Sequence, residues 1–447
     1  MTQGHETRLQ IDSLTDKGDG VGQLDGRQIY VTGALPGETV SVRLHGIKPN
    51  YAQGELLAVL QPHGARVANF CPHDSCGGCQ LGMLEYPAQL DLKRQRLLAA
   101  LAKRGIQAEV AACLGMDRPF AYRNKALYAV RPGPQGAELG FFRKHSHELV
   151  ACDDCALQPP LVEAILAEVR AWLGACRIPA YDEQHHSGVL RYLMLRDGRQ
   201  SGEWMLVLVT LGETLPGVDD LLARLARFPA LRSVVHNINP ARGNRILGFD
   251  NRTLRGDGVI EDALDGLHFC LSPLAFYQIN PEQTLRLYRE ALSQCGLTGQ
   301  ETVFDIYCGI GTISLFLARQ AARVVGVELV PEAIEDARRN AERNGLADKT
   351  EFFAGKAEAL VPELYRQGYR ADVVVVDPPR KGCEPAVLQT MLTMAPHTLV
   401  YVSCDPDSLA RDLAVLLAGG YRLAQVTPVD MFPHTLHVET VARLIRD

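Results

Sequence analysis

The sequence predicts an α/β protein in three parts: a small β-barrel, an α/β middle region and a doubly wound, mostly parallel sheet. Three observations lead to this prediction. Short strand-like segments separated by Gly and Pro fill residues 1–60, strands and helices mix through residues 61–270, and strands alternate regularly with helices over residues 271–447. The chain has 447 residues, of which 47% are hydrophobic, so it can build more than one core.

The first part reads as a closed barrel. It contains five short segments in which apolar and polar residues alternate, each bounded by Gly or Pro. Five strands in so short a stretch indicate a barrel of the OB type, an architecture that often binds nucleic acids, although a fold alone does not establish a function. The five segments are residues 8–14, 20–24, 28–33, 39–47 and 54–62.

The middle part opens with a dense group of cysteines. Cys71, Cys76 and Cys79 lie within nine residues, and Cys155, or alternatively Cys152, could supply a fourth thiolate. The chain shows no secretory signal, so its 12 cysteines are not expected to form a disulfide framework. Four thiolates suit either an iron–sulfur cluster or a structural zinc, and the spacing leaves both open.

Positive charge gathers next to these cysteines. The whole chain has a net charge of −6, yet residues 61–150 carry 12 Lys and Arg against 7 Asp and Glu. Such a region can bind phosphates, or it can simply be a solvated helix surface. The pattern predicts a helix over residues 86–105, with basic side chains at Lys93, Arg94, Arg96, Lys103 and Arg104.

The third part carries the features of a nucleotide-type site. A strand ends in a glycine-rich turn, Asp305–Gly311, that opens a helix, and Glu328 ends the following strand. A carboxylate at that place can accept hydrogen bonds from ribose hydroxyls. The turn lacks the third glycine of the dinucleotide fingerprint. With Asp377, which begins an Asp-Pro-Pro-Arg segment after a later strand, these features indicate an adenosine-containing ligand.

This order of elements is similar to that of class I S-adenosylmethionine-dependent methyltransferases. Two further segments, VSCDP with Cys404 after an apolar strand and HTLHVET with Glu439 at the start of the last strand, resemble those of the RNA uracil-5-methyltransferase family. The resemblance implies that Cys404 is the nucleophile and Glu439 the base. It also implies cofactor contacts at Gln278, Tyr307, Thr312, Glu328 and Asp377; some family members have Asn where this chain has Thr312.

The chemistry explains why a cysteine is needed. C5 of uracil is a poor nucleophile until a thiolate adds at C6, after which a base must remove the C5 proton. Asp405 should disfavour the Cys404 thiolate unless its carboxylate points away, and Arg380 or Lys381 could offset it. The Asp-Pro-Pro-Arg segment also occurs in methyltransferases that act on exocyclic amines, which need no thiolate. An amine-directed RNA methyltransferase is therefore the alternative prediction.

The resemblance extends over nearly the whole chain. The barrel resembles a TRAM module, and the cysteine segment resembles family members that hold a [4Fe–4S] cluster, which assigns Cys71, Cys76, Cys79 and Cys155 as ligands. It implies an RNA partner, with 23S ribosomal RNA expected first and transfer RNA second. Without a signal peptide or a membrane-length apolar run, the sequence predicts a cytoplasmic protein with no membrane contact, and we expect a monomer.

Overall fold

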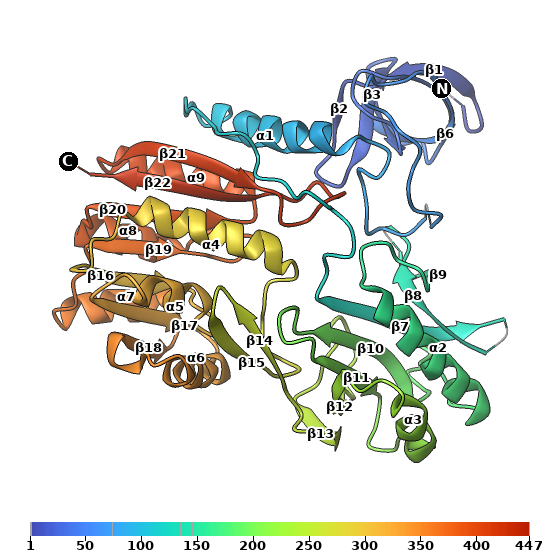
Figure 1. The fold of residues 1–447 in the computed structure, drawn as a ribbon. Helices are drawn as coiled ribbons and strands as arrows, with labels where there is room; N and C mark the ends of the chain where they lie inside the picture. The colour runs from blue at the N-terminus through green and yellow to red at the C-terminus, as the bar shows by residue number, and fades with distance from the viewer. Residues whose placement is uncertain (1, 74, 135, 145, 447) are drawn as a thin grey trace.

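The computed structural model describes residues 2–73, 75–134, 136–144 and 146–446. Figure 1 shows the barrel, the middle region and the C-terminal α/β region arranged around a central gap between ribbons, with the two chain ends on opposite sides. None of the helices in the described part of the chain is long and apolar enough to cross a lipid bilayer.

The N-terminal barrel is a six-stranded sheet in the order β1-β5-β6-β4-β3-β2. The first expected strand is divided, because the chain changes partners there: Ile11 N–H donates to Glu38 O, next to β5, and Asp12 N–H donates to Val21 O in β3. Alternate apolar residues of the strands fill a small core. The strands are β1 (Glu6–Gln10), β2 (Ser13–Leu14), β3 (Asp19–Leu24), β4 (Arg27–Thr32), β5 (Thr39–His45) and β6 (Tyr51–Gln61).

The middle region is a seven-stranded mixed sheet in the order β13-β12-β11-β10-β7-β8-β9. Helices α2 (Pro160–Ala175) and α3 (Val218–Leu225) cover one face of it. Met194, Met205 and Val207 on the other face join the core of the C-terminal region. The strands are β7 (Lys125–Gly133), β8 (Gly136–Phe142), β9 (Leu149–Ala151), β10 (Leu190–Asp197), β11 (Trp204–Thr210), β12 (Leu231–Ile238) and β13 (Asp250–Arg255).

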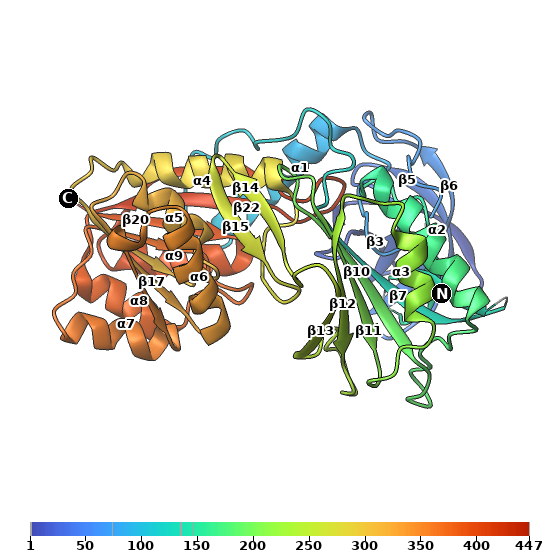
Figure 2. The same ribbon diagram turned by 60° about the horizontal axis from the view of Figure 1, so that its bottom comes forward.

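The C-terminal sheet has the order β18-β17-β16-β19-β20-β22-β21. Its first five strands are parallel, and β22 runs antiparallel between β20 and β21. With helices on both faces, this confirms the expected α/β fold class (Figure 2). The strands are β16 (Thr302–Ile306), β17 (Arg323–Glu328), β18 (Thr350–Ala354), β19 (Val373–Val376), β20 (Thr398–Ser403), β21 (Arg422–Val429) and β22 (Glu439–Ile445).

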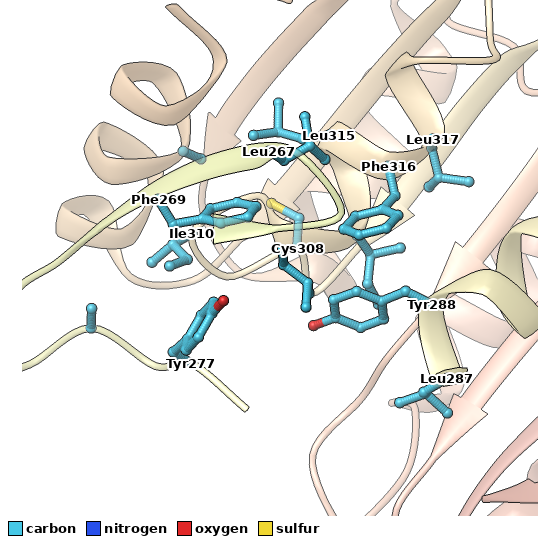
Figure 3. Packing of buried hydrophobic residues seen from close by; sticks show 14 of the residues in the cluster. Leu267, Phe269, Tyr277, Leu287, Tyr288, Cys308, Ile310, Leu315, Phe316 and Leu317 are labelled. Atoms are coloured by element: carbon cyan, nitrogen blue, oxygen red, sulfur yellow. The ribbon is translucent and has the colours of Figure 1, made fainter. Parts of the chain in front are cut away.

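A continuous apolar core joins this sheet to the segment before it. The hairpin of β14 (Ile260–Leu264) and β15 (Leu267–Leu271) shares one apolar core with helices α4 (Pro281–Cys295) and α5 (Thr312–Ala318). In Figure 3, Cys308, which belongs to the glycine-rich turn, lies between the rings of Phe269 and Phe316. The remaining helices are α6 (Pro331–Arg343), η1 (Ala347–Lys349), α7 (Ala357–Arg366), α8 (Pro385–Met394) and α9 (Pro406–Ala418).

One side of the basic helix packs against the C-terminal region, while Lys103 and Arg104 at its end are exposed. Helix α1 (Tyr86–Ala102) lies on α9 and β21. The side chain of Lys93 is fully buried and pairs with Asp430, while Arg94 Nε donates to Val110 O at 2.9 Å and Arg96 Nη1 donates to Leu436 O at 2.6 Å. Lys93 is therefore not part of a basic face for phosphates, whereas the partly exposed Arg94 and Arg96 each use one donor on a main-chain carbonyl of the protein.

Candidate active site

The carboxyl ends of parallel strands meet at one edge of the C-terminal sheet, where ligands bind in folds of this kind. Asp377 directly follows β19, and Cys404 directly follows β20. Because β22 pairs antiparallel with β20 and aligns Ser403 with Thr440, the next position on each strand places Cys404 opposite Glu439. Three of the residues predicted from sequence therefore lie together at this edge.

The Cys404 thiol is held in its neutral form. Burial, together with the neighbouring carboxylates of Glu439 and Asp377, raises its pKa to about 12, although the Arg380 guanidinium acts in the opposite direction. The thiol is only partly buried and stands between the end of β20 and the start of helix α9. A ligand bound at this edge can therefore change the charge around a reachable sulfur.

The sequence suggested that the Asp405 carboxylate disfavours the Cys404 thiolate, and the hydrogen bonds show where this carboxylate points. The Asp405 carboxylate accepts from Ser408 N–H at 2.8 Å and so caps helix α9. It still raises the pKa of Cys404, but less than Glu439 and Asp377 do. Of the two cations considered from sequence, Arg380 acts on the thiol, whereas Lys381 pairs with Glu384.

Carboxylic acids around the thiol are also kept from ionising. Glu439 is 4% exposed, and burial with the nearby Asp377 carboxylate raises its pKa to about 8. Burial and the charge of Asp305 raise the pKa of Asp377 to about 7. Burial raises the pKa of Asp305 to about 7 as well, although Ser314 Oγ donates a hydrogen bond to its carboxylate. A cationic ligand would relieve this crowding of negative charge.

The glycine turn has the backbone that the sequence suggested. Gly309 and Gly311 have φ values of +55° and +81°, and a Cβ on Gly309 would meet open space. The Glu328 carboxylate accepts from Gly309 N–H at 3.2 Å and from Val330 N–H at 3.0 Å, which orients it at the end of β17. Tyr307 also adopts a left-handed φ of +72°, so its side chain leaves the strand direction at the turn.

Two further predicted positions, Thr312 and Gln278, lie near the turn. The Thr312 hydroxyl lies 3.1 Å from the Tyr288 hydroxyl of helix α4, and the negative charges of Asp377, Asp305 and Glu439 all act on Tyr288. Sequence reasoning missed Tyr288 and Asp305. Gln278 lies in the loop before α4, where Asn124 Nδ2 donates to its carbonyl at 2.9 Å. In the described chain, no hydrogen bond joins the Gln278 side chain to Cys404 or Glu439.

The four predicted cysteine ligands lie close enough to influence one another. The charges of Cys71 and Cys155 raise the pKa of both Cys76 and Cys79, in addition to the larger effect of burial, which takes Cys79 to about 12. The chain therefore brings the segment 71–79 and Cys155 into one cluster of thiols. Their donor set and their mutual proximity fit a group bound by four thiolates.

One cation, Arg123, and one further thiol, Cys152, lie beside this cluster. The largely buried Arg123 guanidinium lowers the pKa of Cys76, Cys79 and Cys155, which suits an anionic metal–thiolate group. Cys152 is nearly fully buried, and its ligand atom lies within 4.8 Å of those of His73 and Asp154. Cys152 thus stands beside the cluster and also meets Cys155, because a hydrogen bond between these two thiols is the main cause that lowers the pKa of Cys155 to about 6.

Comparison with known proteins agrees with this fold. The family described as tRNA (Uracil-5-)-methyltransferase matches residues 235–447, and the TRAM domain matches residues 1–57. A protein of Halalkalibacterium halodurans described as an uncharacterized RNA methyltransferase is 45% identical, covering 98% of this chain and 96% of its own length. One of Caldanaerobacter subterraneus with the same description is 43% identical, covering 99% and 98%.

A solved structure extends the likeness to three dimensions. The Pyrococcus abyssi tRNA (uracil-54, C5)-methyltransferase in complex with S-adenosyl-L-homocysteine has a TM-score of 0.78 and 28% identity, covering 98% of this chain and 100% of that one. The likeness therefore includes the barrel and the middle region as well as the catalytic fold. From its fold, its matched domains and these relatives, the chain belongs to the RNA uracil-5-methyltransferase family and is an S-adenosylmethionine-dependent RNA methyltransferase.

Proposed function

We propose that this enzyme methylates C5 of a uracil in structured RNA, with Cys404 as nucleophile and Glu439 as base. The observation that carries the proposal is the strand register, which pairs Ser403 with Thr440 and so brings Cys404 near Glu439, the charge that acts most on its thiol. A thiol and a carboxyl group at adjacent strand ends can act on neighbouring atoms of one ring. An amine-directed methyltransferase would have no use for that thiol.

The reaction balances with these two groups. The Cys404 sulfur, as thiolate, adds to C6 of the uracil, and the electron pair that reaches C5 attacks the methyl carbon of S-adenosylmethionine and releases S-adenosylhomocysteine. The Glu439 carboxylate then takes the C5 proton, the C5–C6 double bond re-forms, and the C6–S bond breaks to return the thiolate. The uracil has to leave its stack to reach both groups, which costs a few kcal/mol and is cheapest in a loop.

Bound cofactor would tune both groups in the direction that the reaction needs. Asp377 and Glu439 raise the Cys404 pKa, and Asp377 raises the Glu439 pKa. A sulfonium held among these carboxylates would compensate their charge and lower both pKa values. The free protein would thus keep a weakly reactive thiol and a protonated Glu439, and the cofactor would activate both.

We further propose 23S ribosomal RNA as the substrate, with transfer RNA as the second candidate. The TRAM match at residues 1–57 supports an RNA partner, and a TRAM-like barrel combined with a four-cysteine cluster is the arrangement we associate with ribosomal substrates. Cys71, Cys76, Cys79 and Cys155 would hold a [4Fe–4S] cluster, whose role would be structural, bracing the middle region against RNA. Monomeric state and cytoplasmic location remain our predictions.

A deletion strain tests both the reaction and the substrate. We expect the strain to lack 5-methyluridine at a site in 23S rRNA, mapped by mass spectrometry of nuclease fragments, and expect wild-type protein to restore it. Cys404→Ala protein should not restore it. A missing 5-methyluridine in tRNA would move the substrate to the second candidate. Restoration by the Cys404→Ala protein, or loss of a methylated amine instead, would overturn the proposed chemistry.

A further inference from the structure

We propose that helix α1 positions the catalytic base. Side chains of α1 hold the segment before Glu439, residues 430–438, which we call the base loop and which lies more than 300 positions later in the sequence. The base loop joins β21 to β22 and leads directly into Glu439. This inference rests on the role proposed for Glu439. Figure 1 shows α1 lying along β21 and α9, beside the strand ends from which the loop emerges.

The base loop has almost no secondary structure of its own, yet its main chain is anchored repeatedly from outside. Six of its carbonyls accept hydrogen bonds from residues beyond the loop, at distances between 2.6 and 3.2 Å. The donors to residues 430, 431, 432, 433, 434 and 436 are, in that order, Gln283, Asn280, Lys93, Tyr122, Leu81 and Arg96. These hydrogen bonds fix the conformation of the loop and thereby the position of Glu439, the residue that follows it.

The strongest anchor is a buried ion pair. Lys93 of α1 and Asp430 at the start of the loop are both fully buried and bonded to each other, and Lys93 Nζ also donates to Phe432 O at 3.0 Å. Tyr86 OH donates to the second Asp430 oxygen at 2.7 Å. Burial lowers the pKa of Lys93 while the Asp430 charge raises it, so the charged pair depends on both partners staying in place.

His434 is held at every polar atom. Its N–H donates to Gln89 Oε1 at 3.0 Å, and its carbonyl accepts from Leu81 N–H at 3.0 Å. One ring nitrogen faces Gln89 Nε2 at 3.1 Å, and the other faces Pro119 O at 3.0 Å. Its φ of +66° is unusual for a residue with a Cβ and persists because these contacts fix it.

The same helix connects the loop to the cysteine cluster. Leu81, which bonds to His434, lies two residues after Cys79, and α1 begins at Tyr86. Phe70, next to Cys71, packs its ring on His434 at 4.5 Å between centroids. The cysteine segment therefore directly precedes α1, the helix that holds the base loop. A change in the structure of this segment would shift α1 and, through the base loop, Glu439.

Arg96 gives a test that spares the buried pair. It is partly exposed and contributes one hydrogen bond to the loop, at Leu436 O, so Arg96→Met should fold. Arg94→Met is the matched control, because Arg94 bonds to the carbonyl of Val110 and not to the loop. Asp16→Asn is a second control, since it removes the negative charge of the other partner of Arg96 without touching Leu436.

The readout isolates proton removal from binding. With ribosomal RNA from the deletion strain as substrate, Glu439→Gln should trap a covalent protein–RNA complex that survives denaturing gel electrophoresis, because the methylated adduct cannot lose its C5 proton. Arg96→Met should accumulate the same complex in part and lower the single-turnover release of methylated RNA by about 10- to 100-fold, with little change in KM. Arg94→Met and Asp16→Asn should match wild type.

Each outcome has a defined meaning. If Arg96→Met releases product as fast as Arg94→Met and shows no adduct, the positioning role is wrong even though Glu439→Gln traps RNA. If Arg96→Met changes only KM, the helix serves RNA binding and the inference also fails. If Glu439→Gln forms no adduct with ribosomal or transfer RNA, the proposed function itself fails, and this result is separate from the other two.

Discussion

Replacing Glu439 with Gln should make the Cys404 thiol more reactive, but only at high pH. Among charged groups, Glu439 contributes most to the raised pKa of Cys404, which lies at about 12 against an ordinary 9.0. That difference of about 3 units corresponds to about 4 kcal/mol against the thiolate. If removing the Glu439 charge recovers about one unit, or about 1.4 kcal/mol, alkylation of the thiol should accelerate about ten-fold.

The pH dependence follows from the pKa of Glu439 itself. Because burial raises that pKa to about 8, the carboxyl group is neutral in the wild-type protein below this pH and charged above it. Gln is neutral throughout. At about pH 9.5 the substitution therefore removes a charge and should give the ten-fold acceleration, whereas at about pH 6.5 it removes none and the two proteins should react alike.

The assay is iodoacetamide labelling followed by peptide mass spectrometry at Cys404, with the partly exposed Cys270 as an internal reference. Asp407→Asn is the matched control. That carboxylate lies three residues from Cys404 but pairs with Lys103 at 3.3 Å, so its loss should leave the labelling rate unchanged. Equal acceleration at both pH values, or none at the higher one, would refute the placement of these charges.

Other consequences can be measured separately. Because burial and Asp305 raise the pKa of Asp377 to about 7, raising the pH from about 6 to about 9 adds negative charge to the site. The affinity for S-adenosylmethionine, measured by calorimetry, should therefore rise about ten-fold relative to the affinity for S-adenosylhomocysteine, which lacks the sulfonium. An unchanged ratio of the two affinities would contradict this. Cys155→Ser should lose most of the iron of anaerobically purified protein and Cys152→Ser should keep it, whereas zinc in place of iron would exclude the cluster. Lys93→Met should lower the free energy of unfolding by about 3–5 kcal/mol by stranding a buried Asp430 carboxylate, and Lys93→Met/Asp430→Leu should recover most of it in chemical denaturation.

The sequence could predict the catalytic edge because parallel strands align their carboxyl ends. A residue that directly follows an apolar strand, such as Asp377 or Cys404, must lie at that edge whatever the order of the strands. Glu439 lies there for a different reason, since β22 runs antiparallel and contributes its first residue. The positions of these groups could thus be expected, and their charges and pKa values could not, because those depend on burial and distances.

Two strands lack the patterns that reveal strands in a sequence. Strand β21 contains Pro428, which cannot donate to a ladder and argues against a strand, and it is tolerated near the end of an edge strand. Strand β18 is short and shows no clear alternation of exposed and buried residues. Both lie at sheet edges, where the surrounding fold decides the conformation more than the local sequence does.

Contacts between distant segments were also out of reach. Lys93 looks like any basic residue of an exposed helix, and its partner Asp430 lies 337 positions away along the chain. Tyr288 sits among the apolar residues of α4 and gives no sign that its hydroxyl meets Thr312. Only the folded structure separates such inward-facing polar groups from solvated ones.

The most direct test of the central claim is to identify the bond between enzyme and RNA. Glu439→Gln protein would be incubated with S-adenosylmethionine and ribosomal RNA from the deletion strain, digested with protease and nuclease, and analysed by tandem mass spectrometry. We expect a nucleotide bearing an added methyl group, linked through C6 to the sulfur of Cys404. A linkage at another residue, or full product formation by Cys404→Ala protein in the same assay, would contradict the claim.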